Sequence, residues 1–199
     1  DREGCCRTNA DCDDGDVCTD DYCVSSTCSH RLSTVGDCCR ADYLFENDFS
    51  AGAFALEGWL IQNTAHPVGW QLAAQGPAAT GGATGGALYY GEVTQRTYDA
   101  GGVAHSGIAR TAPIVLPDDV RVFASFDAYL DLDPRSLADS LELRVLIGPS
   151  YQQSYKLWEK DDIGANTNGE FKYASLDLTE WAGNTVRLQF TFNSLVVPN

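Results

Sequence analysis

The sequence contains no methionine and few basic residues. Its 13 Lys and Arg face 28 Asp and Glu, which gives a formal net charge of -15. A surface that binds nucleic acid must be basic to neutralise phosphates, so this balance argues against nucleic acid and anionic membranes as partners. Long hydrophobic runs are also lacking, and none approaches the roughly 20 apolar residues of a membrane-spanning helix. Because the chain does not start with methionine, we expect Asp1 to be a mature N-terminus left by removal of a signal peptide.

Cysteine is absent after residue 39, and all eight cysteines lie in the segment before it. This segment has few large apolar residues, so it needs covalent cross-links or a metal to fold. No CxxC pair is present and only His30 lies near, so the spacing fits a tetrahedral zinc site poorly. We therefore expect disulfides, which require an oxidising compartment and predict a secreted or cell-surface protein. The cysteines expected in bridges are Cys5, Cys6, Cys12, Cys18, Cys23, Cys28, Cys38 and Cys39.

Two adjacent cysteine pairs open and close this segment, Cys5 with Cys6 and Cys38 with Cys39. Vicinal cysteines rarely bond each other, because the resulting ring strains the peptide between them. Each member is therefore expected to bond elsewhere, which would tie the two ends of the segment to its middle. The spacing alone does not choose among the many possible pairings.

The same segment is crowded with aspartates. If Asn9 is the first position of an EF-hand-type loop, Asp11, Asp13 and Asp20 fall at the third, fifth and twelfth positions, where such loops place Ca2+ ligands. The match is partial, because Gly15 comes one residue late and the twelfth residue is not Glu. The alternative is a solvated acidic loop. We predict Ca2+ as the cofactor, with ligands from Asn9, Asp11, Asp13, Asp16 and Asp20.

The run DGDVCTDDYCVSSTCSH, residues 14–30, resembles the short cysteine-rich repeat of slime-mould extracellular matrix proteins. That repeat is also common in secreted proteins of myxobacteria and their relatives. The resemblance implies an extracellular, non-catalytic module of a surface or matrix protein. The vicinal pairs lie outside the repeat, so it carries no pairing pattern to this chain.

After the cysteines the pattern changes to that of β-strands, which predicts a disulfide module over 1–40 and a second domain over 41–199. Apolar and polar residues alternate over long stretches, so each strand has one face in a core and one in water. We predict an all-β fold, an antiparallel jelly-roll β-sandwich preceded by a small, loop-dominated disulfide-rich module. The long strands are expected at 120–131, 141–147 and 186–193, and shorter ones at 41–46, 58–61, 155–158 and 171–173. We expect glycine-rich loops from Gly69 to the apolar 87–90 and over 91–107, and at most a helical turn at 178–181.

The segments FENDFSAGAFALEGW, ALYYGE, VFASFDAYLD and LELRVLIG, in this order, resemble the MAM-like jelly-roll domains of bacterial secreted proteins. The resemblance covers residues 43–199 and implies an adhesion, sugar-binding or accessory module that often holds a structural Ca2+. The implied ligands are Glu46, Asp48 and the acids from Asp127 to Asp139. The alternative for each is an exposed carboxylate at a strand end.

Such domains usually end in one more strand than this chain provides after 186–197. A sandwich without its last strand exposes an unpaired edge, which a strand from another copy can complete. Head-to-tail addition of this kind does not close on itself and gives a filament. The alternative is a sheet that is complete as it stands.

No catalytic motif is recognisable. His30, His66 and His105 do not lie in HExxH, and neither a GxSxG elbow nor a phosphate-binding glycine loop is present. Asp161 and Asp162 could serve a glycosidase, but such pairs are unavoidable in a chain this acidic. We therefore predict that the protein is not an enzyme. Exposed aromatic rings could stack on sugars, with core packing as the alternative for each, and the candidates are Trp70, Tyr89, Tyr90, Tyr151 and Trp158.

Together these features predict a secreted, calcium-binding structural protein. It would be a subunit of an extracellular filament or surface assembly, with copies of itself as partners. The alternative is a carbohydrate-binding or adhesion module of a larger secreted protein, with extracellular glycans as partners.

Overall fold

The structure is a computed structural model that divides into two compact units, Asp1–Tyr43 and Leu44–Asn199. It describes residues 6–16, 18–24, 26–33, 43–50, 56–64, 68–73, 86–99, 103–118, 120–132, 139–164 and 166–194. The boundary lies three residues after the one expected from the end of the cysteine-rich segment.

The first unit is built on a hairpin of β1 (Thr19–Val24) and β2 (Thr27–Leu32), preceded by the short 3-10 helix η1 (Asn9–Cys12). The hairpin was not predicted, because its strands are polar and lack an alternating apolar face. Two disulfides hold it, Cys6–Cys23 and Cys12–Cys28. Cys23 and Cys28 face each other across the strands, yet each is bonded to the segment before the hairpin.

These two bridges confirm disulfide bonding for four of the predicted cysteines, and Cys6 bonds to a residue other than its neighbour in sequence. The bridge from Cys6 also ties the start of the segment to its middle, as expected. Cys5, Cys38 and Cys39 lie outside the described residues. The bridge expected for Cys18 stays a prediction.

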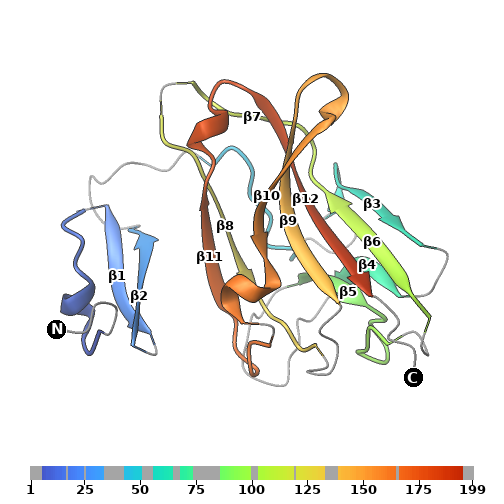
Figure 1. Cartoon of the computed structure of the whole chain (residues 1–199), viewed down its shortest axis with the longest axis horizontal. Helices are drawn as coiled ribbons and strands as arrows, with labels where there is room; N and C mark the ends of the chain where they lie inside the picture. Colours follow the sequence, from blue (N-terminus) through green and yellow to red (C-terminus); the bar gives the residue numbers. More distant parts are fainter. Residues whose placement is uncertain are drawn as a thin grey trace. The chain divides into compact units, whose positions relative to one another are not determined.

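The second unit is a two-layered β-sandwich (Figure 1). One layer is an antiparallel sheet in the order β10-β9-β12-β6-β3, with the short β7 paired to the start of β12. The other layer consists of the strand pairs β4–β5 and β8–β11. The strands are β3 (Leu60–Asn63), β4 (Gly69–Ala73), β5 (Ala87–Gly91), β6 (His105–Arg110), β7 (Ile114–Val115), β8 (Phe123–Ala128), β9 (Ser140–Ile147), β10 (Gln153–Glu159), β11 (Lys172–Asp177) and β12 (Thr185–Ser194).

The pairing of these strands is nested. β6 pairs with β12, β8 with β11 and β9 with β10, all antiparallel, as in one long folded ribbon. The ribbon is rolled so that β9 also pairs with β12, which joins its inner and outer strands in one sheet. This confirms the predicted antiparallel jelly-roll β-sandwich and the all-β class.

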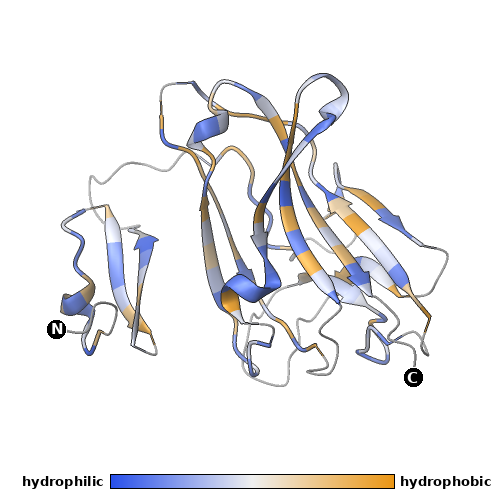
Figure 2. Cartoon of the chain, in the orientation of Figure 1, coloured by the Kyte–Doolittle hydropathy of each residue, from blue (hydrophilic) through white to orange (hydrophobic). Residues whose placement is uncertain are grey.

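Phe190 shows how the layers meet. Its ring centroid lies 6.1 Å from that of Trp70 on β4 and 5.4 Å from that of Phe126 on β8. Both strand pairs therefore cover the same face of the large sheet. Beneath them lie fully buried side chains such as Leu143 and Val145 of β9. The long strands alternate between hydrophobic and hydrophilic residues, as Figure 2 shows, which is the pattern used to predict them.

Several local predictions were wrong. Residues 43–46 form no strand, and Tyr43, Leu44 and Phe45 are exposed. The loop expected from Gly69 onward begins with β4, because Trp70 packs into the core. The predicted loop over 91–107 already contains the start of β6. Another local prediction is confirmed, because the helical turn expected at 178–181 is present as the 3-10 helix η6 (Thr179–Trp181).

Candidate functional site

Three polar side chains meet on the hairpin of the first unit. Asp21 on β1 lies directly opposite His30 on β2, and Asp14 approaches from the preceding loop. His30 Nδ1 is 2.7 Å from Asp21 Oδ1 and 3.3 Å from Asp14 Oδ2. One donor atom from each residue lies within 4.8 Å of the other two. In the described part of the chain, the only other such group consists of Cys6, Cys12 and Cys28, whose sulfurs are in disulfides.

Each carboxylate of this cluster is held by its second oxygen. Asp14 Oδ1 accepts hydrogen bonds from the Asp16 backbone N–H at 2.9 Å and from the Thr19 hydroxyl at 3.1 Å. Asp21 Oδ2 accepts one from the Asp14 backbone N–H at 3.3 Å. The remaining oxygens are thereby directed toward His30. The hydrogen bond with His30 is the largest cause that holds the pKa of Asp21 below its ordinary value.

The aspartates predicted as calcium ligands do not converge in this way. They are used instead to fold the loop, mostly by accepting hydrogen bonds from nearby backbone N–H groups. Asp11 Oδ2 accepts from Arg7 and Thr8, both at 2.8 Å, which lowers the pKa of Asp11 and starts η1. Asp13 and Asp16 each accept from the residue two positions further on, at 2.9 Å.

Asn9 plays a similar structural role, since its side-chain oxygen accepts from the Cys23 backbone N–H at 2.9 Å. Asp20 lies next to Asp21 on β1 but belongs to no converging group of the described residues. The calcium loop over Asn9–Asp20 therefore stays a prediction. The cluster that the structure does bring together was missed, because it depends on the register of an unpredicted hairpin.

The candidate ligands of the second unit are also separate from one another. Glu46 and Asp127 are exposed, and Asp127 lies on the outer side of β8. Asp48 accepts hydrogen bonds from the backbone N–H and hydroxyl of Ser50, at 2.9 and 2.8 Å, which lower the pKa of Asp48. None of them belongs to a group of three converging ligands among the described residues.

The aromatic side chains proposed for sugar stacking differ in accessibility. Trp70 and Trp158 are buried in the core, so their rings cannot form an exposed platform. Tyr90 stacks on Phe192, with ring centroids 4.1 Å apart. Tyr151 is half-buried, with the Arg187 guanidinium 4.7 Å from its ring centroid, and Tyr89 is half-buried on β5. Trp70 and Trp158 therefore serve the core, and a stacking role for Tyr89, Tyr90 and Tyr151 stays a prediction.

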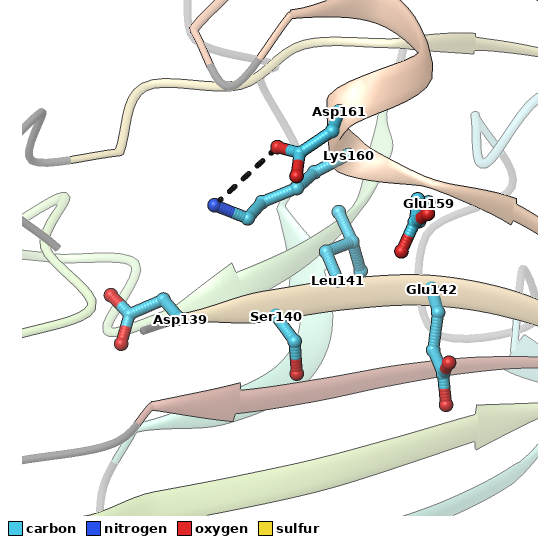
Figure 3. Close-up of a pocket in the computed structure, with 7 residues that line it drawn as sticks. All are labelled: Asp139, Ser140, Leu141, Glu142, Glu159, Lys160 and Asp161. Atoms are coloured by element: carbon cyan, nitrogen blue, oxygen red, sulfur yellow. Dashed lines mark ion pairs between the residues drawn. The ribbon is translucent and has the colours of Figure 1, made fainter. Parts of the chain in front are cut away.

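A small polar pocket of about 160 Å³ lies where β9 begins and β10 ends (Figure 3). Its lining includes Lys160, which is 8% exposed and whose Nζ lies 3.7 Å from Asp161 Oδ1. Two of its acids are engaged elsewhere, Glu142 with Arg144 at 3.1 Å and Glu159 with Lys156 at 2.9 Å. The pocket is smaller than the roughly 300 Å³ at which drug-sized ligand sites begin, so it suits one small polar group. The lining residues are Asp139, Ser140, Leu141, Glu142, Glu159, Lys160 and Asp161.

The buried His105 has a packing role in the sandwich. His105 is buried, with Nδ1 2.8 Å from the Tyr90 hydroxyl. Burial, with the charge of Asp139 as a lesser cause, raises the pKa of Tyr90 to about 12. This phenol stays protonated at neutral pH, whereas a nucleophile needs the opposite shift. His66 lies outside the described residues.

Comparison of the chain with protein-family models, with curated proteins and with solved structures finds no match. The two resemblances drawn from the sequence therefore stay predictions. The described part of the chain contains no helix with the length and hydrophobicity needed to cross a membrane. The two disulfides fit a protein of an oxidising compartment.

Proposed function

We propose that the chain is a secreted structural protein, in which a disulfide-locked acidic module is joined to a jelly-roll sandwich. The observation that carries the proposal is the pair of bridges Cys6–Cys23 and Cys12–Cys28, because the described residues of this unit form almost no hydrophobic core. Such cross-links are made outside the cytoplasm. Most of the aspartates around them fold the loop, which is a structural use and not a catalytic one.

Calcium is the proposed cofactor of the acidic loop. The support is the density of aspartates in residues 11–21, several of which use only one carboxylate oxygen in the hydrogen bonds described above. Oxygen-rich loops of this kind suit a hard cation. The test is thermal unfolding of the protein in excess Ca2+ and in EGTA. A midpoint that Ca2+ leaves unchanged at millimolar concentration would remove calcium from the proposal.

Assembly of copies by strand addition is the proposed route to a filament or surface layer. The two edge strands of the large sheet differ in how readily they could pair with another strand, and this difference supports the proposed assembly. The β10 edge carries the ion pair of Lys156 with Glu159 and a register shift between Lys156 and Trp158, both of which discourage pairing. The β3 edge has no charged residue in Leu60–Asn63, and Leu60 is 38% exposed. Residues 195–199, after which one further strand was expected to be missing, lie outside the described residues.

Negative-stain microscopy of the protein with Ca2+ and with EGTA tests this assembly. We expect filaments or ordered clusters that Leu60→Lys abolishes, because a charge on the edge blocks strand addition. Monomers under both conditions would contradict the assembly and leave the disulfide module unaffected.

A carbohydrate-binding module is the second candidate function. The small pocket at Lys160 supports it, since an ammonium and carboxylates can together bind a hydroxyl group of a sugar. A glycan array probed with the monomer tests it. Binding that is lost in Lys160→Gln and kept in Lys172→Gln would favour this function over the structural one.

A further inference from the structure

The cluster of Asp14, Asp21 and His30 differs in its donor atoms from the calcium loop described above. Two carboxylate oxygens and one imidazole nitrogen face a common point. Calcium takes six to eight oxygens, whereas zinc binds nitrogen and oxygen in small tetrahedral sets. We propose that these three side chains form a zinc site on the hairpin of the first unit. The proposal depends neither on calcium nor on assembly.

The distances suit such an ion. Zinc bound at about 2.0 Å to each of two tetrahedral ligands holds these donor atoms about 3.3 Å apart. The separation of His30 Nδ1 from Asp14 Oδ2 is 3.3 Å. The separation from Asp21 Oδ1 is 2.7 Å, so that pair has to open slightly as the ion replaces the hydrogen bond between them. A water molecule would take the fourth position.

The cluster is held in place before any ion arrives. Asp21 and His30 are cross-strand partners, and the cysteine pair Cys23 and Cys28 faces across the same strands two residues further toward the turn. Each of these cysteines is bonded to the segment before the hairpin, which fixes both strands near the ligands. The second carboxylate oxygens are bound by the Thr19 hydroxyl and by backbone N–H groups. Hydrogen bonds of this kind orient the ligands of metal sites.

The competing explanation is an ion pair that braces the hairpin without a metal. In that case His30 is protonated and its partners are charge-paired aspartates. The two explanations differ in what zinc does to His30. A ligand imidazole shows a large shift of its side-chain 15N resonances on adding Zn2+, whereas a bracing ion pair does not.

The experiment is a titration of the oxidised full-length protein with Zn2+, followed by calorimetry and by side-chain 15N spectra of the histidines. We expect one zinc ion per chain and a shift of the His30 resonances. Asp14→Asn, Asp21→Asn and His30→Gln should each weaken binding at least tenfold. Asp118→Asn removes the same charge from an exposed position of the second unit and should leave binding unchanged. Backbone amide spectra of each variant check that the hairpin is intact.

Three results would overturn the proposal. The first is zinc binding that leaves the His30 resonances in place in the unmodified chain, which needs no variant to interpret. The second is an equal loss of binding in Asp118→Asn, which would indicate a diffuse acidic attraction. The third is displacement of zinc by an equal concentration of Ca2+, which would indicate an oxygen-only site.

Discussion

The two units of this chain are stabilised in different ways. The sandwich buries Leu143, Val145 and Val186 almost completely between its layers. Among the described residues of the first unit, only Cys6 and Cys12 are buried apolar residues, and both are in disulfides. A short polar segment cannot offset the entropy of its chain by burial, so covalent bonds take the place of a core. The comparison shows that two units of one chain can be stabilised by different interactions, one by disulfides and the other by burial of apolar side chains.

The largest effect is expected from removing a bridge. Replacing both Cys12 and Cys28 with Ser should cost the first unit about 2–5 kcal/mol, enough to unfold a segment whose described residues bury so little apolar surface. Limited proteolysis should then cut within residues 12–28 while the sandwich stays intact. An uncut hairpin in this variant would show that other interactions hold the first unit.

The second prediction concerns the loss of a core side chain in the sandwich. Leu143 is 1% exposed on the central strand β9, so Leu143→Ala should lower the free energy of unfolding by about 2–5 kcal/mol. Denaturant unfolding followed by tryptophan fluorescence measures this loss. Leu60→Ala on β3 is the matched control, with a change of at most about 0.5 kcal/mol expected at a more exposed site. Equal losses in the two variants would contradict the core described above.

A smaller effect depends on pH. The pKa of Tyr90 is about 12 in the folded sandwich and about 10 in an unfolded chain, so folding favours the protonated phenol. Its contribution to stability is complete below pH of about 10 and is lost as the pH rises toward about 12. Tyr90→Phe should flatten the fall of unfolding free energy in this range. Tyr22→Phe on the exposed face of β1 serves as the control and should leave the slope unchanged.

The smallest effect concerns the start of η1. Asp11 accepts two backbone hydrogen bonds there, and Asp11→Ala should slightly destabilise this turn. Because these bonds hold the pKa of Asp11 below its ordinary value, this stabilisation is present above that value and is lost as the pH falls through the folded pKa. Amide exchange of Arg7 and Thr8 measures it. Asp13→Ala should leave the exchange of these two amides unchanged, since Asp13 bonds Gly15 instead.

The long strands of the sandwich could be predicted because their residues alternate over 141–147 and 186–193. The prediction of a strand at 41–46 failed over residues 43–46, because a local apolar run does not show whether a partner strand exists. The first hairpin could not be predicted, since its stability comes from bridges between distant cysteines and not from periodicity. The same limit hid the Asp14–Asp21–His30 cluster, because only the pairing register places Asp21 opposite His30.

The central claim is that disulfides stabilise the first unit while a hydrophobic core stabilises the sandwich. Hydrogen exchange of the intact protein with and without reductant is the most direct test of it. All cysteines lie before residue 40, so a reductant acts on the first unit alone. Protection of the β1 and β2 amides should collapse on reduction, while the amides of β9 and β12 keep theirs. If β1 and β2 stay protected after reduction, disulfides are not what holds the first unit together.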